Sequence, residues 1–189
     1  GLYNEGRDTD FLRPMAFLPQ GTYAEAYRGF IVAYQGIGLY GNLFLGDLGD
    51  LEYHGYVGIG NIAQEETLVR SIEADLNKFA PITGIIVTDL SVNNRISRGM
   101  KVAWNTPLTG LKLAASNLYM IGEFLLHPGA PKIGQLKIPH WWLFSLEYMT
   151  GNFTLAAEYN ELNTEVTAFG VTVEDQTNQA YYVMLSYMI

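Results

Sequence analysis

The chain has 189 residues, of which 49% are hydrophobic and 13% aromatic but only 16% charged, well below the ~25% of ordinary soluble domains. It contains no cysteine, which excludes a disulfide framework and a thiolate metal site. The formal net charge of −8, with only 11 Lys and Arg residues, argues against nucleic-acid binding. The length predicts one domain, or a piece of a larger one, and residues 1–8 show no signal-peptide pattern.

The first 60 residues predict a loop and then a pair of strands. Residues 1–30 contain Pro14, Pro19 and mixed charges without periodicity, so we expect an external loop there. Apolar and polar residues alternate over 36–46 and again over 51–60, which predicts two strands joined by a turn at 47–50. In the second strand, Glu52 and His54 fall on the face opposite to the apolar residues.

The stretch 61–95 predicts a long loop that contains one helix. Leu68, Ile72, Leu76 and Phe79 recur at helical spacing, and Pro81 follows the expected end. On the polar side of this helix lie Glu65, Glu66, Arg70, Glu73 and Asp75.

Alternation resumes over 100–105 and 111–121, around a turn at 106–110, with Lys101 and Lys112 on the polar face. It blurs at 117–120, which indicates a bulge. Pro128, Pro131 and Pro139 predict that 123–139 is a loop.

The clearest signal is the stretch 140–160, which reads as a β-hairpin around Gly151. Trp142, Phe144, Leu146 and Tyr148 share one face of the first arm, with Ser145 and Glu147 on the other; the second arm alternates in the same way and places Glu158 on the polar face. One polar face and one apolar face with aromatic residues at its ends are expected of a transmembrane β-barrel. The same pattern is also expected of a hairpin in a soluble sandwich. Two further segments, 165–173 and 179–189, are expected as a loop strand and a last span.

The order of the connections favours the barrel. Turns at 47–50, 106–110 and 150–152 are short, whereas 61–95, 123–139 and 162–178 are long, as in barrels with short periplasmic turns and long external loops. Aromatic residues then form an inner girdle and an outer girdle, consisting respectively of Trp104, Tyr148, Phe153 and Tyr187, and of Trp142, Tyr159 and Tyr181. The predicted fold is therefore an all-β, antiparallel up-and-down transmembrane β-barrel with one helix in a long loop.

The spans number seven on this interpretation, and bacterial barrels usually have an even number of strands. We therefore expect 1–189 to be a single segment of a larger barrel, with at least one strand before Gly1. The alternative is a complete small barrel with a further span inside 1–30 or 162–178.

Four stretches carry a resemblance: GLYNEGRDTDFLRP at the start, LPQ at 18–20, YRGF at 27–30 and GIGLYGNLFLG at 36–46. They resemble the central part of porin-like outer-membrane proteins of Gram-negative bacteria. The resemblance covers about the first 60 residues, and the remainder is similar only in hairpin style. It implies a barrel of about sixteen strands, often a homotrimer. It also implies a location in the outer membrane, with lipid and lipopolysaccharide around the barrel, a loop folded into the channel, and no catalytic residue or cofactor.

The residues expected to line a pore are Glu52, His54, Lys101, Lys112, Glu147 and Glu158, and those expected on a constriction loop are Glu65, Glu66, Arg70, Glu73 and Asp75. Such charges filter solutes; alternatively the strand charges only keep a lumen solvated, and the helix lies over the rim or against a neighbouring subunit. The histidines at 54, 127 and 140 are too scattered to predict a metal site.

The expected function is a water-filled channel for passive diffusion of small hydrophilic solutes or ions, with cationic solutes favoured by the negative net charge. The sequence shows no hydrolase motif, and we expect no enzymatic activity. The alternatives are a barrel with a non-transport role (adhesin, anchor or membrane enzyme) and a soluble β-sandwich or barrel that binds a ligand.

Overall fold

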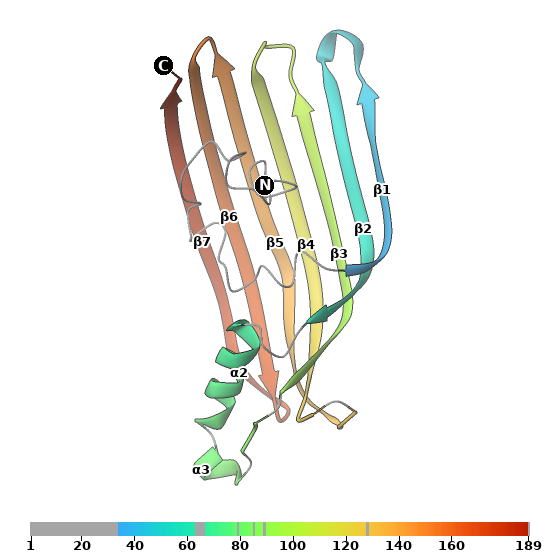
Figure 1. Ribbon diagram of the computed structural model, residues 1–189, viewed down its shortest axis with the longest axis vertical. Helices are drawn as coiled ribbons and strands as arrows, with labels where there is room; N and C mark the ends of the chain where they lie inside the picture. Colours follow the sequence, from blue (N-terminus) through green and yellow to red (C-terminus); the bar gives the residue numbers. More distant parts are fainter. Residues whose placement is uncertain are drawn as a thin grey trace.

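The computed structural model describes residues 34–188 except 63–66, 79, 85, 89 and 128. Seven strands of the described residues form one antiparallel sheet in chain order, with β1 and β7 at its two edges (Figure 1). The elements are β1 (Tyr34–Phe44), η3 (Gly46–Leu48), β2 (Asp50–Ile62), α2 (Thr67–Asn77), α3 (Ala80–Thr83), β3 (Ser91–Asn105), β4 (Leu111–Leu125), β5 (Lys132–Thr150), β6 (Phe153–Ala168) and β7 (Val171–Tyr187). The expected loop at 1–30 lies outside the described residues. No described helix combines the length and hydropathy needed to cross a bilayer.

The antiparallel up-and-down order and the central hairpin are confirmed. β5 ends at Thr150 and β6 begins at Phe153, with Gly151 in the left-handed region (φ 56°), where glycine is the residue with no steric cost. The bulge expected at 117–120 is not in β4 itself. The register shifts between Leu118 and Met120 where β4 pairs with β5, but the extra residue lies on β5, between Ile138 and Trp141.

The expected loop at 123–139 is wrong, because β5 begins at Lys132 and the connection from β4 spans only 126–131. Pro139 sits at a register shift between Lys137 and His140. A bulge tolerates proline, since its missing N–H leaves no broken ladder bond. The shift also moves the apolar residues to the other parity, so the period-two pattern that predicts a strand is interrupted.

The expected long connection at 162–178 is also wrong. β6 continues to Ala168 and β7 begins at Val171, around a two-residue turn in which Phe169 (φ 52°) and Gly170 (φ 81°) are both left-handed. This is the dihedral pattern that closes tight hairpins. β3 likewise begins at Ser91, inside the expected loop at 61–95. Among the described connections only that between β2 and β3 is long, so the strict alternation of short and long connections is not present.

The two faces of the sheet are distinguished by α2, which packs on one of them. Val69, Ile72 and Leu76 of α2 join an apolar cluster with strand residues that share this face, here named the helix face. The strand members of the cluster are Val92, Met120, Phe124, Leu136, Ile138, Leu162, Val166 and Ala168. The other side of the sheet is named the opposite face. In Figure 1, α2 and α3 lie at one end of the sheet, away from the turns η3 and 106–110.

Two hydrogen bonds with the side-chain amide of Asn77 hold the segment after α2 against the helix. The Asn77 Nδ2 donates to the carbonyl oxygen of Val87 (2.7 Å), and the Val87 N–H donates to Asn77 Oδ1 (2.8 Å). Both backbone groups of Val87 are thereby satisfied, so this buried residue can enter the apolar cluster without an orphaned polar group.

Candidate functional site

Polar side chains of the helix face gather in three adjacent cross-strand rows. The register runs through Asp50, Asn105, Lys112 and Glu147 in one row, through Asn42, Glu52, Ser145, Glu158 and Tyr182 in the next, and through Tyr40, His54, Lys101, Ser116 and Asn160 in the third. These side chains are named the polar belt. All six strand residues singled out from the sequence (Glu52, His54, Lys101, Lys112, Glu147 and Glu158) lie in it.

One cluster of the polar belt joins β2, β3 and β4. Glu52 accepts a hydrogen bond from Asn105 Nδ2 (2.8 Å) and two from Lys112 Nζ (3.0 and 3.2 Å). Because the three residues come from three strands, the contacts fix the charge positions across the sheet. The bonds to Lys112 are charge-assisted, which makes them the stronger kind.

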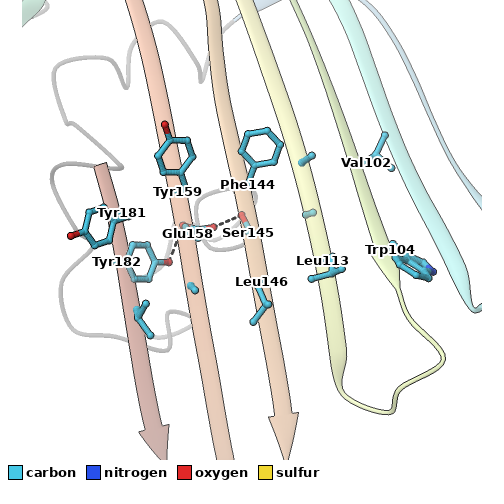
Figure 2. A pocket seen from close by; sticks show the side chains of 14 residues that line it. Val102, Trp104, Leu113, Phe144, Ser145, Leu146, Glu158, Tyr159, Tyr181 and Tyr182 are labelled. Atoms are coloured by element: carbon cyan, nitrogen blue, oxygen red, sulfur yellow. Dashed lines mark hydrogen bonds between the residues drawn. The ribbon is translucent and has the colours of Figure 1, made fainter. Parts of the chain in front are cut away.

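A second cluster joins β5, β6 and β7 around a buried carboxylate. Ser145 Oγ donates to Glu158 Oε1 (2.7 Å) and Tyr182 OH donates to Glu158 Oε2 (2.8 Å), as Figure 2 shows. Glu158 is 3% exposed. A carboxylate this buried is costly unless it is hydrogen-bonded, so both hydroxyls stabilise the sheet at this row.

The sequence interpretation missed the partners of these carboxylates. Ser145, Tyr182 and Asn105 were not singled out, and neither was Asn160, which accepts a hydrogen bond from the Trp141 indole. A signal for Ser145 was present: a two-residue turn at 151–152 sets Ser145 opposite Glu158 by counting back along both arms. For Asn105 the strand end was predicted correctly, but the register of β3 against β2 depends on the long connection between them, which gives no count. For Tyr182 no count was available because the tight turn between β6 and β7 was not predicted.

The charges of the polar belt are segregated along the rows. Lys101 and Lys112 lie on β3 and β4, and carboxylates flank them, with Glu52 on β2 and Glu147 and Glu158 on β5 and β6. Glu147 lies directly opposite Lys112 in the register, and His54 lies opposite Lys101. Charges of both signs at fixed positions create a lateral field over the surface. Within the described residues, no group of three or more His, Asp or Glu side chains is arranged to hold a metal ion.

The opposite face behind the polar belt is apolar and exposed. Phe144 is 46% exposed and Val183 is 71% exposed, while Leu155 is half-buried. Small residues, Ala115 and Ala157, leave a hollow of about 640 Å³ between larger neighbours that include Trp104, Phe144 and Tyr181 (Figure 2). None of Phe144, Leu155 and Val183, which lie on β5, β6 and β7, is sealed inside the described structure.

Aromatic side chains mark both limits of this apolar surface on β5, β6 and β7. Toward the short turns, the rings of Phe153 and Tyr187 lie 4.7 Å apart. Toward α2, Phe144 is stacked between Trp142 (5.9 Å) and Tyr159 (6.4 Å). Tyrosine and tryptophan bring an apolar body and a polar tip, the combination found where a membrane meets water.

The apolar surface crosses the sheet obliquely. Leu43 of β1 and Val183 of β7 belong to the same cross-strand row. From that row the exposed apolar residues of β7 continue to Tyr187, toward the short turns, whereas those of β1 continue in the other direction to Ile37. If the exposed apolar residues form one straight band, the strands must be tilted relative to that band, as they are in a barrel wall.

Toward α2 the two faces exchange character. On β6, Leu162 and Val166 are buried on the helix face, while Glu161 and Glu165 lie on the opposite face. The opposite face carries ion pairs here, between Lys137 and Glu165 (3.0 Å) and between His140 and Glu161 (3.7 Å). The hydroxyl of Tyr159 and then Gln179 Nε2 hydrogen-bond to Glu161 and hold the pKa of its carboxyl below the ordinary value.

The residues expected on a constriction loop do not gather at the polar belt. Glu65 and Glu66 lie outside the described residues. Arg70 is exposed, Glu73 accepts a hydrogen bond from the Leu90 N–H (3.3 Å), and Asp75 pairs with Lys78 (2.6 Å) at the surface. The apolar residues of α2 pack on the strand rows beyond the polar belt, which places the helix at the far end of the helix face.

Comparison of the chain with protein-family models, with curated proteins and with solved structures returned no match in any of the three.

Proposed function

We propose that this chain forms wall strands of an outer-membrane β-barrel that acts as a porin, a water-filled channel for passive diffusion of small hydrophilic solutes or ions. The observation that carries the proposal is the division of the middle rows: a hydrogen-bonded polar belt on the helix face backs onto an exposed apolar surface on the opposite face. That division is what a strand needs when one side meets lipid and the other meets water.

The exposed side chains support lipid rather than a second protein layer as the neighbour of the opposite face. A soluble sandwich would cover its apolar face with another sheet, but the described residues form a single sheet. Exposed apolar patches of this kind mark membrane or protein contacts, and the aromatic limits and oblique course favour a membrane. In a Gram-negative outer membrane the neighbours would be lipid and lipopolysaccharide, or other subunits of a homotrimer.

The polar belt supports a conducting lumen. Its residues hydrogen-bond to one another across strands, so this face of the wall stays polar. The side chains of Glu52 and Lys112 are partly exposed and would present fixed charges to water. Lys101 and Lys112 between carboxylates would give a solute both signs of charge to interact with. The net charge of −8 favours cations.

The test is conductance of the full-length protein in a planar bilayer. We expect stepwise openings, and we expect Lys112→Gln to raise the cation-to-anion permeability ratio because it leaves the Glu52 charge unopposed. The matched control is Lys137→Gln, which removes a lysine from the opposite face and should leave the ratio unchanged. Absence of any conductance from folded protein would refute the porin proposal and favour a non-transport barrel.

A further inference from the structure

The opposite face contains a second hollow, over β1 to β4, that the channel does not explain. Its volume is about 610 Å³. Its walls are apolar, with Ile37, Leu39, Val57 and Met100, and Gly55 lies at its floor on the same face. A glycine there leaves the groove deeper than any side chain would.

The side chain of Arg98 places a positive charge at this hollow. Arg98 lines it, and its guanidinium lies 4.5 Å from the ring centroid of Tyr119, an arrangement that fixes the charge in place. Arg95, on the same strand, pairs with Glu123 (3.1 Å), but no carboxylate of the described residues forms an ion pair with Arg98. Its planar guanidinium is therefore available for an anion, and phosphate is one that it matches bidentately.

An amide in the same lining also lacks a partner. The Nδ2 of Asn117 is buried with no hydrogen-bond partner among the described residues. A buried donor left unsatisfied is costly. A phosphate or ester oxygen held in the hollow would supply the acceptor.

The position of the hollow matches a lipid headgroup boundary. Met100 and Leu39 continue the exposed apolar surface, whereas beyond Arg98 toward α2 the same face carries the charged group of Arg95, Glu123 and Lys132. Along β3, Arg98 thus lies where the apolar surface ends. A lipid with its chains along the surface would bring its headgroup to this level.

We propose that this hollow, with Arg98, Tyr119, Asn117 and Gly55, is a binding site for a phosphorylated glycolipid of the outer leaflet, of the lipid A type. The site rests on the proposed function, because it needs the opposite face to meet a membrane. Arg98 binds the phosphate, and an acyl chain lies over Gly55 between the apolar walls.

A lipid with several chains fits better than one with a single chain. The hollow over β1 to β4 ends at Met100, and the hollow of Figure 2 begins at Val102, the next residue of β3 on the same face. The two hollows together offer adjacent apolar beds. Long connections of outer-membrane barrels are external, and the long described connection between β2 and β3 contains α2. Under the proposed function, the leaflet that Arg98 reaches is therefore the outer one.

The test is binding of bis-phosphorylated lipid A to the full chain in detergent micelles, followed by native mass spectrometry with the dephosphorylated lipid as comparison. We expect Arg98→Gln to weaken binding of the phosphorylated form about tenfold, the scale of one lost charge-assisted contact, and to leave the dephosphorylated form unchanged. Arg98→Lys should recover part of the affinity. The matched control, Arg95→Gln, should change it by less than about twofold, since Glu123 already occupies that guanidinium.

A second variant tests the groove over Gly55 in which the acyl chain is proposed to lie. A Cβ at Gly55 would approach only the Gly99 carbonyl oxygen, at 3.8 Å, so Gly55→Leu can fold and should weaken both lipid forms by filling the groove. Far-UV circular dichroism checks that each variant is folded. The assignment is overturned if Arg98→Gln binds phosphorylated lipid A as tightly as the unmodified chain, or if phosphatidylglycerol binds equally well. Conductance that persists in an Arg98→Gln protein with lost lipid affinity would separate this site from the channel.

Discussion

Two regions of the same strands have their polar and apolar faces reversed. In the middle rows of β5 to β7 the helix face is polar and the opposite face is apolar; toward α2 the helix face is apolar and the opposite face is charged. The exchange takes place within β6, between Tyr159 and Leu162. Because side chains simply alternate along a strand, only the surroundings change. Under the proposed function, the middle meets lipid outside and water inside, whereas the end meets water outside and packs against a helix inside.

The largest expected effect comes from placing a charge on the apolar part of the opposite face of β6. Ala157→Arg places a guanidinium in the apolar band and should lower the free energy of unfolding in lipid vesicles by about 2–4 kcal/mol. Asn163→Arg, on the same face beyond Tyr159, should change it by less than about 0.5 kcal/mol. Urea titration followed by tryptophan fluorescence measures both. Equal losses at the two positions would mean that no lipid boundary lies between them.

The packed end can be tested through α2. Leu76 is 4% exposed within the apolar cluster, so Leu76→Ala should weaken docking of the helix by about 2–3 kcal/mol. Hydrogen exchange should show faster exchange over 67–90 and unchanged exchange in β1 and β2. Ile82→Ala, at an 84% exposed position of α3, is the control and should leave exchange as it was.

The buried carboxylate of the middle rows offers a smaller change. Tyr182→Phe removes one donor to Glu158 and should cost about 1 kcal/mol, the typical loss for one such hydrogen bond. Tyr181→Phe, at the exposed neighbouring position, should cost almost nothing. A matching loss in both variants, measured by denaturation in the same micelles, would argue that the Glu158 bonds contribute no stability.

The smallest expected effect is the pH response of the charged end, where Glu161 lies beyond the apolar band. Its pKa is lowered in the folded chain from an ordinary 4.5, first by the Tyr159 hydroxyl and then by Gln179. A lowered pKa means that the stabilisation is present above pH 4.5 and is lost as the pH falls through the folded value. Glu161→Gln removes this contribution, so the variant should melt slightly below the unmodified chain above pH 4.5. The difference between the two thermal melts should disappear as the pH falls through the folded pKa.

Sequence reasoning predicted the segments in which one alternation runs unbroken. The hairpin around Gly151 and the paired strands of β1 and β2 were found because their polar and apolar residues keep one parity throughout. It failed where parity changes: at Pro139, where a bulge shifts the register, and after Tyr159, where the two faces exchange character. It also missed 174–178, between the two strand segments expected there, where all side chains are exposed and so carry no alternation.

The candidate site shows the same division. Parity alone assigned Glu52, Lys112 and Glu158 to one face, and the structure places them together in adjacent rows. Which carboxylate meets which donor depends on register between strands distant in sequence, as for Glu52 and Lys112. Such pairings follow from bulges and turn lengths, and a single sequence specifies those only where the turn is tight.

Accessibility of single spin labels along 153–167 tests the central claim most directly, and the chain suits it because it has no native cysteine. With the full protein in lipid vesicles, labels at Leu155 and Ala157 should be accessible to oxygen dissolved in the bilayer, and a label at Thr154 should be accessible to a water-soluble nickel complex. Past Tyr159 the pattern should reverse, with Asn163 and Glu165 accessible to the nickel complex. Oxygen and nickel accessibility that keeps one parity from 153 to 167, or that shows no alternation, would contradict the account.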